Sequence, residues 1–162
     1  MFRAPRLALA VTVITSLVLT LALAGSVLAG GKPLVATLLP ANEPGTGGDP
    51  NPAAIGTFRG TFNYGQAELC YTLTASNLSA TIVAAHIHIA PAGVNGPVVI
   101  PLTAPVNGSS SGCIENIDQA LIKAIMQDPS AYYVNVHTNE AGNTASRPGG
   151  AIRGQLAEPE DD

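Results

Sequence analysis

The chain has 162 residues, of which 46% are hydrophobic and only 11% are charged. An average soluble domain carries roughly 25% charged residues, but this hydrophobic fraction is too high for a disordered chain. Seven basic and eleven acidic residues give a net charge of −4. The composition predicts one small folded domain and argues against nucleic-acid binding, which needs a basic surface to neutralise phosphates.

The N-terminus has the pattern of an export signal. Arg3 and Arg6 precede an uncharged apolar run over residues 7–24, and small residues at 27 and 29 form a cleavage site. We expect residues 1–29 to be a signal peptide cleaved after Ala29. The alternative is an uncleaved anchor, because the apolar run is long enough to span a bilayer. Only an uncleaved anchor would bring the protein into contact with a membrane, through this segment.

Short β-type runs follow one another over residues 30–157, separated by Gly, Pro and Asn. Two of them, around Tyr64-Gly65, are expected to form a hairpin. Residues 107–112 are expected to be a polar flexible loop, and residues 158–162 an acidic tail. The sequence predicts strands at residues 33–39, 55–63, 66–75, 82–89, 98–100, 132–138 and 151–157.

One helix is predicted over residues 116–127, because Ile117, Leu121 and Ile125 recur every four residues. Asn116 or Asp118 can cap its start, and Asp128-Pro129 ends it. Strands of this number and spacing predict an all-β fold, an antiparallel Greek-key β-sandwich with one short helix in a crossover.

Cys70 and Cys113 are the only cysteines. In an exported protein two cysteines most often pair, and a disulfide over this separation stabilises the fold by roughly 3–4 kcal/mol. Two free thiols or two thiolate metal ligands are the alternatives. Export and a disulfide together place the protein in the periplasm, at the cell surface or outside the cell.

All three histidines of the chain lie in predicted strands. His86 and His88 are two residues apart, so both rings point to the same side of their strand. Two imidazoles placed in this way can share one copper or zinc ion. His137 is the third ligand if its strand lies nearby. The alternative is that the histidines are structural, on a solvated face or hydrogen-bonded beneath a loop.

Two further residues are candidates for supporting this site. Asn135 shares a strand face with His137 and can hydrogen-bond a ligand ring; otherwise it is an ordinary strand-end polar residue. Arg153 either clamps the carboxylate of a ligand or forms an internal ion pair with Glu43 or Glu68. The internal pair is the favoured interpretation.

Catalytic motifs are missing from the sequence. The serines at 109–111 lack the GxSxG context of a hydrolase, and residues 93–96 form a turn, not a phosphate-binding loop. A metal-dependent enzyme would need an acid–base residue beside an open metal position, for which only Glu140 is near His137. No catalytic residue is therefore assigned, and enzyme activity is the less favoured hypothesis.

Four motifs follow one another along the chain: AAHIH at 84–88, GVNGPVV at 93–99, YVNVHT at 133–138 and GAIRGQL at 150–156. In this order they resemble the CHRD domain, which is named after chordin and also occurs alone in exported bacterial and archaeal proteins. A fifth segment, LLPANEP at residues 38–44, resembles the first strand of that family and its following turn. The resemblance spans about residues 34–156.

The resemblance implies a secreted β-sandwich of the immunoglobulin-like or superoxide-dismutase-like kind. The His-x-His strand is also similar to the copper-ligand strand of copper–zinc superoxide dismutase. A complete site of that kind needs six histidines and an aspartate, whereas this chain has three histidines. Chordin sequesters growth factors, but the cysteine-rich modules that accompany that role are missing here.

We therefore expect a non-enzymatic exported binding module, with one copper or zinc ion held by His86, His88 and His137. No other cofactor is expected. The alternative function is a cell-surface or extracellular protein-interaction module with structural histidines. In both cases the extracellular or periplasmic partner is unidentified.

Overall fold

The computed structural model describes residues 31–45, 47–139 and 150–160. The predicted signal segment, residues 1–29, lies outside these ranges. Within the described ranges, no helix has both the length and the apolar composition needed to cross a bilayer.

The described chain is built mainly of β-strands joined by short turns. The one α-helix, α1 (Gln119–Gln127), lies between β6 and β7, and two 3-10 turns, η1 (Pro40–Asn42) and η2 (Pro129–Ala131), lie in connections. The strands are β1 (Lys32–Leu38), β2 (Ile55–Asn63), β3 (Glu68–Ser76), β4 (Ile82–Ile89), β5 (Val98–Leu102), β6 (Ser109–Ile114), β7 (Tyr132–Thr138) and β8 (Ile152–Gln155).

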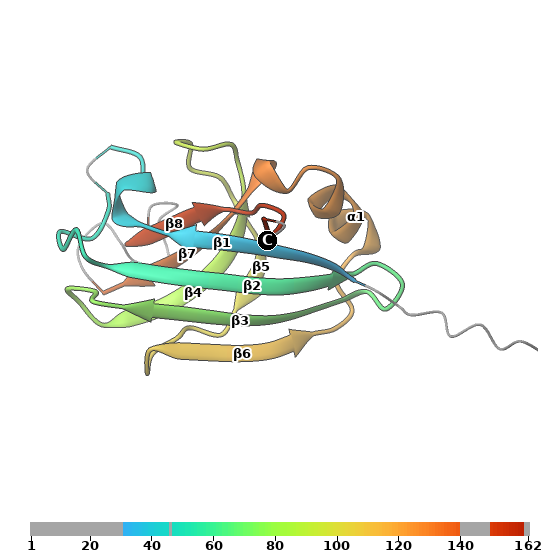
Figure 1. Ribbon diagram of the computed structural model, residues 1–162, viewed down its shortest axis with the longest axis horizontal. Helices are drawn as coiled ribbons and strands as arrows, with labels where there is room; N and C mark the ends of the chain where they lie inside the picture. The colour runs from blue at the N-terminus through green and yellow to red at the C-terminus, as the bar shows by residue number, and fades with distance from the viewer. Residues whose placement is uncertain (1–30, 46, 140–149, 161–162) are drawn as a thin grey trace, which may run out of the picture.

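The strands form two four-stranded sheets that pack face to face (Figure 1). Sheet I has the order β1-β2-β3-β6 and sheet II the order β5-β4-β7-β8, with antiparallel neighbours throughout. The predicted antiparallel sandwich is confirmed. Its Greek-key connectivity stays a prediction.

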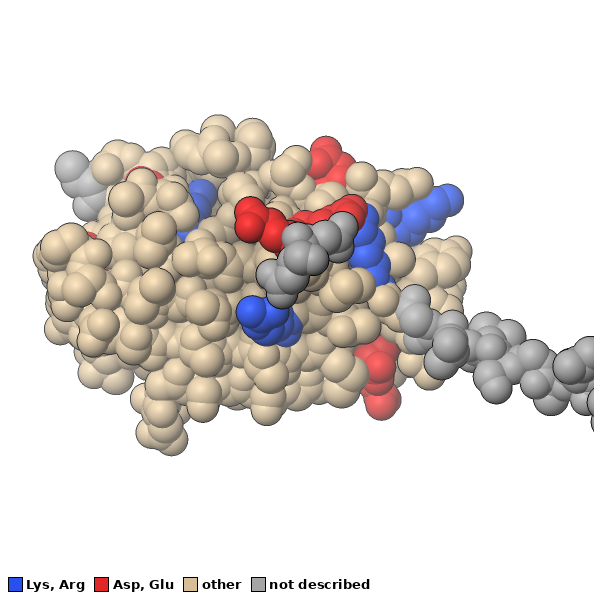
Figure 2. Space-filling view, viewed as in Figure 1, with Lys and Arg blue, Asp and Glu red and all other residues tan. Residues whose placement is uncertain are grey.

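Alternation of apolar and polar residues explains how sheet I packs. In β3, the inward side chains Leu69, Tyr71 and Leu73 belong to the core. The outward face of sheet I carries mainly uncharged hydroxyl side chains, and the view in Figure 2 shows few charged atoms. Arg59 is exposed on this face.

Sheet II is different, because its strand β7 is buried along its whole length. Val134 and Val136 face the core between the sheets, whereas Tyr133, Asn135 and His137 are on the other side of the strand. Side chains on that outer side are polar and yet buried.

The prediction of a loop at residues 107–112 is wrong, because most of this segment belongs to β6. Serine and glycine have low β-propensity, so the segment carries no strand pattern of its own. It forms a strand because it pairs with β3, where Cys113 lies opposite Cys70 in register.

The predicted disulfide is present between Cys70 and Cys113 and closes a loop of 43 residues. Because it joins β3 to β6 at the edge of sheet I, it ties the weakest strand of the sheet to its neighbour. A disulfide is also consistent with an oxidising, extracytoplasmic compartment.

Helix α1 begins at Gln119, three residues later than predicted. Asn116 has a positive φ of 59° and cannot belong to the helix. Asp118 is the cap, since its Oδ1 accepts a hydrogen bond of 2.9 Å from the Ala120 N–H. The predicted end is confirmed: Asp128 is the C-cap.

Candidate metal centre

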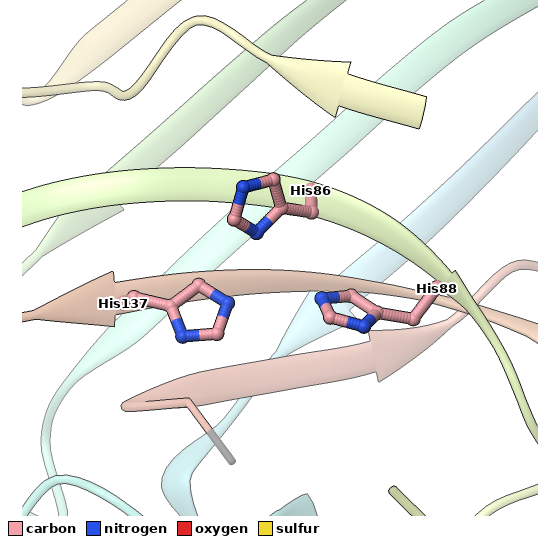
Figure 3. A group of neighbouring side chains, drawn as sticks. All are labelled: His86, His88 and His137. Atoms are coloured by element: carbon pink, nitrogen blue, oxygen red, sulfur yellow. The ribbon is translucent and has the colours of Figure 1, made fainter. Parts of the chain in front are cut away.

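Pairing of β4 with β7 brings the three histidines together on the outer side of sheet II. In this register His88 lies opposite Tyr133, His86 opposite Asn135, and His137 opposite Ala84. Figure 3 shows the three rings projecting from these two strands toward a common space. The strand of His137 is therefore adjacent to the strand of His86 and His88, as a third ligand from His137 requires.

The rings are close enough to share one small ligand. One ring nitrogen of each histidine lies within 4.8 Å of those of the other two. The centroid of the His86 ring is 5.5 Å from that of His88 and 5.0 Å from that of His137. His88 and His137 are buried, and His86 is half-buried, so access from solvent lies on the side of His86.

A backbone carbonyl determines which nitrogen of His88 faces the other rings. The Nδ1 atom is 2.9 Å from the carbonyl oxygen of Gly96. A carbonyl only accepts, so Nδ1 carries the proton and donates it. The Nε2 atom then keeps a free lone pair, which is the tautomer typical of a metal-ligating histidine.

Two buried ring nitrogens of the triad lack a hydrogen-bond partner within the described part of the chain. They are His86 Nδ1 and His88 Nε2. Such atoms are rare in folded proteins, and each is explained by strain, a water or an ion. Here both belong to rings that lie beside each other.

Burial also favours the neutral form of His86 and His88. Desolvation lowers the pKa of His86 and of His88 below the ordinary value of 6.5. For His88 the hydrogen bond to the Gly96 carbonyl opposes this effect. Neutral imidazole is the form that binds metals.

Arg153 lies on β8, on the same outer side of sheet II, and is buried. Its Nε donates a 2.8 Å hydrogen bond to Glu43 Oε2 in a fully buried ion pair. Of the two sequence candidates, Glu43 is therefore the partner of Arg153, through the loop that follows β1. Burial raises the pKa of Glu43, and the Arg153 charge opposes this rise.

The guanidinium of Arg153 makes two more hydrogen bonds and one aromatic contact. Nη1 donates to the Val94 carbonyl at 2.9 Å, and Nη2 donates to Asn95 Oδ1. The Cζ atom lies 4.0 Å from the centre of the Tyr133 ring, within the range of a cation–π contact. Arg153 thus joins the loop after β1, the loop between β4 and β5, and strand β7.

Asn135 is completely buried, with His86 and Arg153 as its register partners on the two neighbouring strands. Gly150 approaches it so closely that a Cβ on Gly150 would lie 1.5 Å from the Asn135 side-chain oxygen. The alternative of an ordinary strand-end residue does not fit this burial. The role of Asn135 as a partner of a ligand ring stays a prediction, because no such bond is recorded among the described residues.

Sequence reasoning missed Tyr133 as part of the site. Its ring stacks on the His88 ring with centroids 4.8 Å apart and planes 7° apart. The available signal was the alternation of β7, which places Tyr133 on the face of Asn135 and His137. Glu140, the candidate acid–base residue, lies outside the described residues.

A second group of potential ligands, Glu68, Cys70 and Cys113, lies on sheet I. Its two sulfur atoms are joined in the disulfide and are therefore not thiolate ligands.

The fold and site together define a disulfide-linked β-sandwich with a buried histidine triad on the outer side of one sheet. Residues 34–156 match the family model of the CHRD domain, and the chain belongs to this family. Membership suggests a non-enzymatic extracellular module. Comparison with curated proteins and with solved structures gave no match.

We predict that His86 and His88 of the metal-free protein each reach half-protonation only below pH 6.5, because burial lowers both pKa values. Unfolding releases this constraint. The stability contributed by the neutral rings is therefore complete above the unfolded pKa near 6.5 and is lost as pH falls toward the folded values. NMR titration of the ring protons, folded and in urea, measures the shift. Equal pKa values in the two states would contradict it.

We predict that Glu43→Ala lowers the free energy of unfolding by roughly 3–5 kcal/mol, because it leaves the buried charge of Arg153 without a partner. The matched control is Glu158→Ala. Glu158 pairs with Lys32 but is 66% exposed, so its loss costs about 1 kcal/mol or less. Urea denaturation measures the free energy of unfolding of both variants. Equal losses would contradict the prediction that the buried Glu43–Arg153 pair contributes more than the exposed Glu158–Lys32 pair.

Proposed function

We propose that this protein is an exported CHRD-domain module that binds one copper or zinc ion through His86, His88 and His137. The observation that carries the proposal is the convergence of three buried or half-buried rings, with ring nitrogens within 4.8 Å of one another. Imidazole suits both metals. Export of the module is supported by the disulfide and by the signal pattern of residues 1–29.

The energetics of the site favour an occupant. A buried polar atom without a partner costs about 1–3 kcal/mol, and the nitrogens of His86 and His88 that lack partners face this cost. An ion bound to them removes it. Metal–nitrogen bonds of about 2.0–2.1 Å place ligand nitrogens roughly 3.4 Å apart in a tetrahedral site, so small ring rotations close the triad around an ion.

Three protein ligands leave a fourth position for water or another small ligand. We assign the ion a storage, delivery or structural role, because no described residue is placed to act as an acid or base there. Redox cycling of the superoxide dismutase kind is not proposed, since the chain has only three histidines.

The second candidate is an extracellular interaction module in which the histidines are structural. The stacking of His88 on Tyr133 and its hydrogen bond to Gly96 favour this alternative, because both contacts stabilise the fold without an ion. In that case the protein takes up no metal, and replacement of His86 lowers stability.

We predict that the purified protein, incubated with Cu²⁺ or Zn²⁺ and then desalted, retains about one ion per chain by elemental analysis. A triple variant, His86→Ala with His88→Ala and His137→Ala, should lose the ion and keep the β-sheet circular dichroism signal. The control is the Cys70→Ala/Cys113→Ala variant, which removes the other candidate ligand group and should retain the ion.

Wild-type protein without retained metal would overturn the proposal in favour of the interaction module. So would equal retention by the triple variant, because the ion would then be bound elsewhere. His88→Ala alone should abolish stoichiometric uptake, since it removes the ligand with the fixed tautomer.

A further inference from the structure

We propose that Arg153 is a positioning residue of the histidine triad: it acts through the loop at residues 90–97 and through Tyr133 to hold His88 in the tautomer and orientation that an ion requires. The proposal rests on the proposed function, because it assigns a role relative to the ion bound there. Among the described residues, the side chain of Arg153 contacts Glu43, Val94, Asn95 and the Tyr133 ring.

The first connection runs through the loop between β4 and β5. Arg153 binds the Val94 carbonyl and the Asn95 side chain, which are the two residues before Gly96. Gly96 then makes two buried hydrogen bonds: its carbonyl accepts from His88 Nδ1, and its N–H donates to the Tyr133 hydroxyl oxygen at 3.2 Å. The position of the carbonyl that fixes the His88 tautomer thus depends on residues that Arg153 holds.

The backbone of this loop packs closely against β4 at Gly96. A Cβ on Gly96 would be 1.9 Å from the Ile89 carbonyl oxygen, so only glycine fits. Ile89 also donates its N–H to the Pro97 carbonyl at 3.1 Å. Strand β4 therefore holds the end of the loop at Pro97, and Arg153 holds the two residues before Gly96.

The second connection runs through the Tyr133 ring. β7 lies between β4 and β8 in sheet II, so Tyr133 has His88 on one neighbouring strand and Arg153 on the other. The Arg153 guanidinium lies over the ring at 4.0 Å, and the His88 ring stacks on it at 4.8 Å. This arrangement fixes the plane of the His88 ring, because a rotated imidazole would lose the stack.

Glu43 completes the arrangement. Its carboxylate binds Nε of Arg153 at 2.8 Å, which leaves both terminal nitrogens for the loop. It also balances the buried positive charge next to the triad, where an uncompensated cation would repel a metal ion. The pair thereby keeps Arg153 compatible with an ion nearby.

A purely structural role for Arg153 would lower stability and leave the His88 tautomer unchanged in any variant that folds. The positioning role predicts a change at His88 itself. Loss of an outer hydrogen-bond partner of a ligand typically weakens metal binding by roughly 10–100-fold, while the number of ions bound stays at one per chain.

The experiment compares three variants of the full chain by ¹⁵N NMR of the His88 ring and by competition titration with Zn²⁺. Arg153→Met/Glu43→Met removes the ion pair and leaves no unpaired buried charge. Asn95→Ala removes one loop contact at an exposed residue and keeps the pair. The control, Arg59→Met, makes the same chemical change on the exposed face of sheet I.

We expect wild type and Arg59→Met to show only the Nδ1-protonated tautomer of His88. The double variant should show a mixture of tautomers and roughly 10–100-fold weaker Zn²⁺ binding. Asn95→Ala should change both readouts in the same direction by a smaller factor, and it decides the matter if the double variant does not fold.

An unchanged tautomer and unchanged affinity in a folded double variant, or in Asn95→Ala where only that variant folds, would overturn the positioning role. Failure of the proposed function is distinguishable, because wild type would then bind no Zn²⁺. The tautomer comparison in the metal-free protein would still test the connection from Arg153 to His88, and a tautomer that does not respond would overturn it.

Discussion

The antiparallel pairing of β4 with β7 is the constraint on which the site depends. It sets His86 beside Asn135 and His88 beside Tyr133, and it places His137 one step further along the same face. A shift of this register by one residue would turn the side chains of one strand to the opposite face. The apolar residues Ala85, Ile87, Val134 and Val136 fix the register, because they must remain in the core.

The same pairing creates an energetic problem that the rest of sheet II solves. The outer side of β7 carries polar side chains, yet the strand is buried on both sides. Charged and polar groups are buried at a large cost unless they are paired. Arg153 meets this condition with four partners: Glu43, Val94, Asn95 and the Tyr133 ring. The loops after β1 and between β4 and β5 are thereby drawn over the sheet.

Within this outer layer, one ring nitrogen of His86 and one of His88 have no hydrogen-bond partner among the described residues. Each of the three guanidinium nitrogens of Arg153 donates a hydrogen bond. By contrast, His86 Nδ1 and His88 Nε2 have no partner in the described chain. The contrast within one buried layer is the reason for assigning an ion to the histidines rather than a purely structural role. Membership of the CHRD family suggests an extracellular module and does not identify its ligand.

Much of the fold follows from local sequence patterns. β2, β4 and β7 have the predicted limits because apolar alternation and flanking turn residues mark them clearly. β6 could not be predicted, since its serines and glycine carry no strand pattern of their own and the strand depends on its pairing with β3. Spacing gave His86 and His88 as a pair, but His137 depended on strand adjacency, which is a tertiary property.

The limits of prediction at the site have the same origin. Arg153 had two acidic candidates in the sequence, and only the folded loop after β1 selects Glu43 over Glu68. The stack of His88 on Tyr133 joins residues 45 positions apart, well beyond the window of roughly 11–18 residues in which local patterns are informative. The burial of the whole layer beneath loops likewise has no local signal.

The most direct test of the account is anomalous diffraction from crystals of the copper- or zinc-loaded protein, recorded at the absorption edge of the metal. The account predicts one strong peak between the three rings, about 2.0–2.1 Å from one nitrogen of each histidine, with His88 bound through Nε2. A map without a peak in the triad, or with the ion held by other residues, would contradict it.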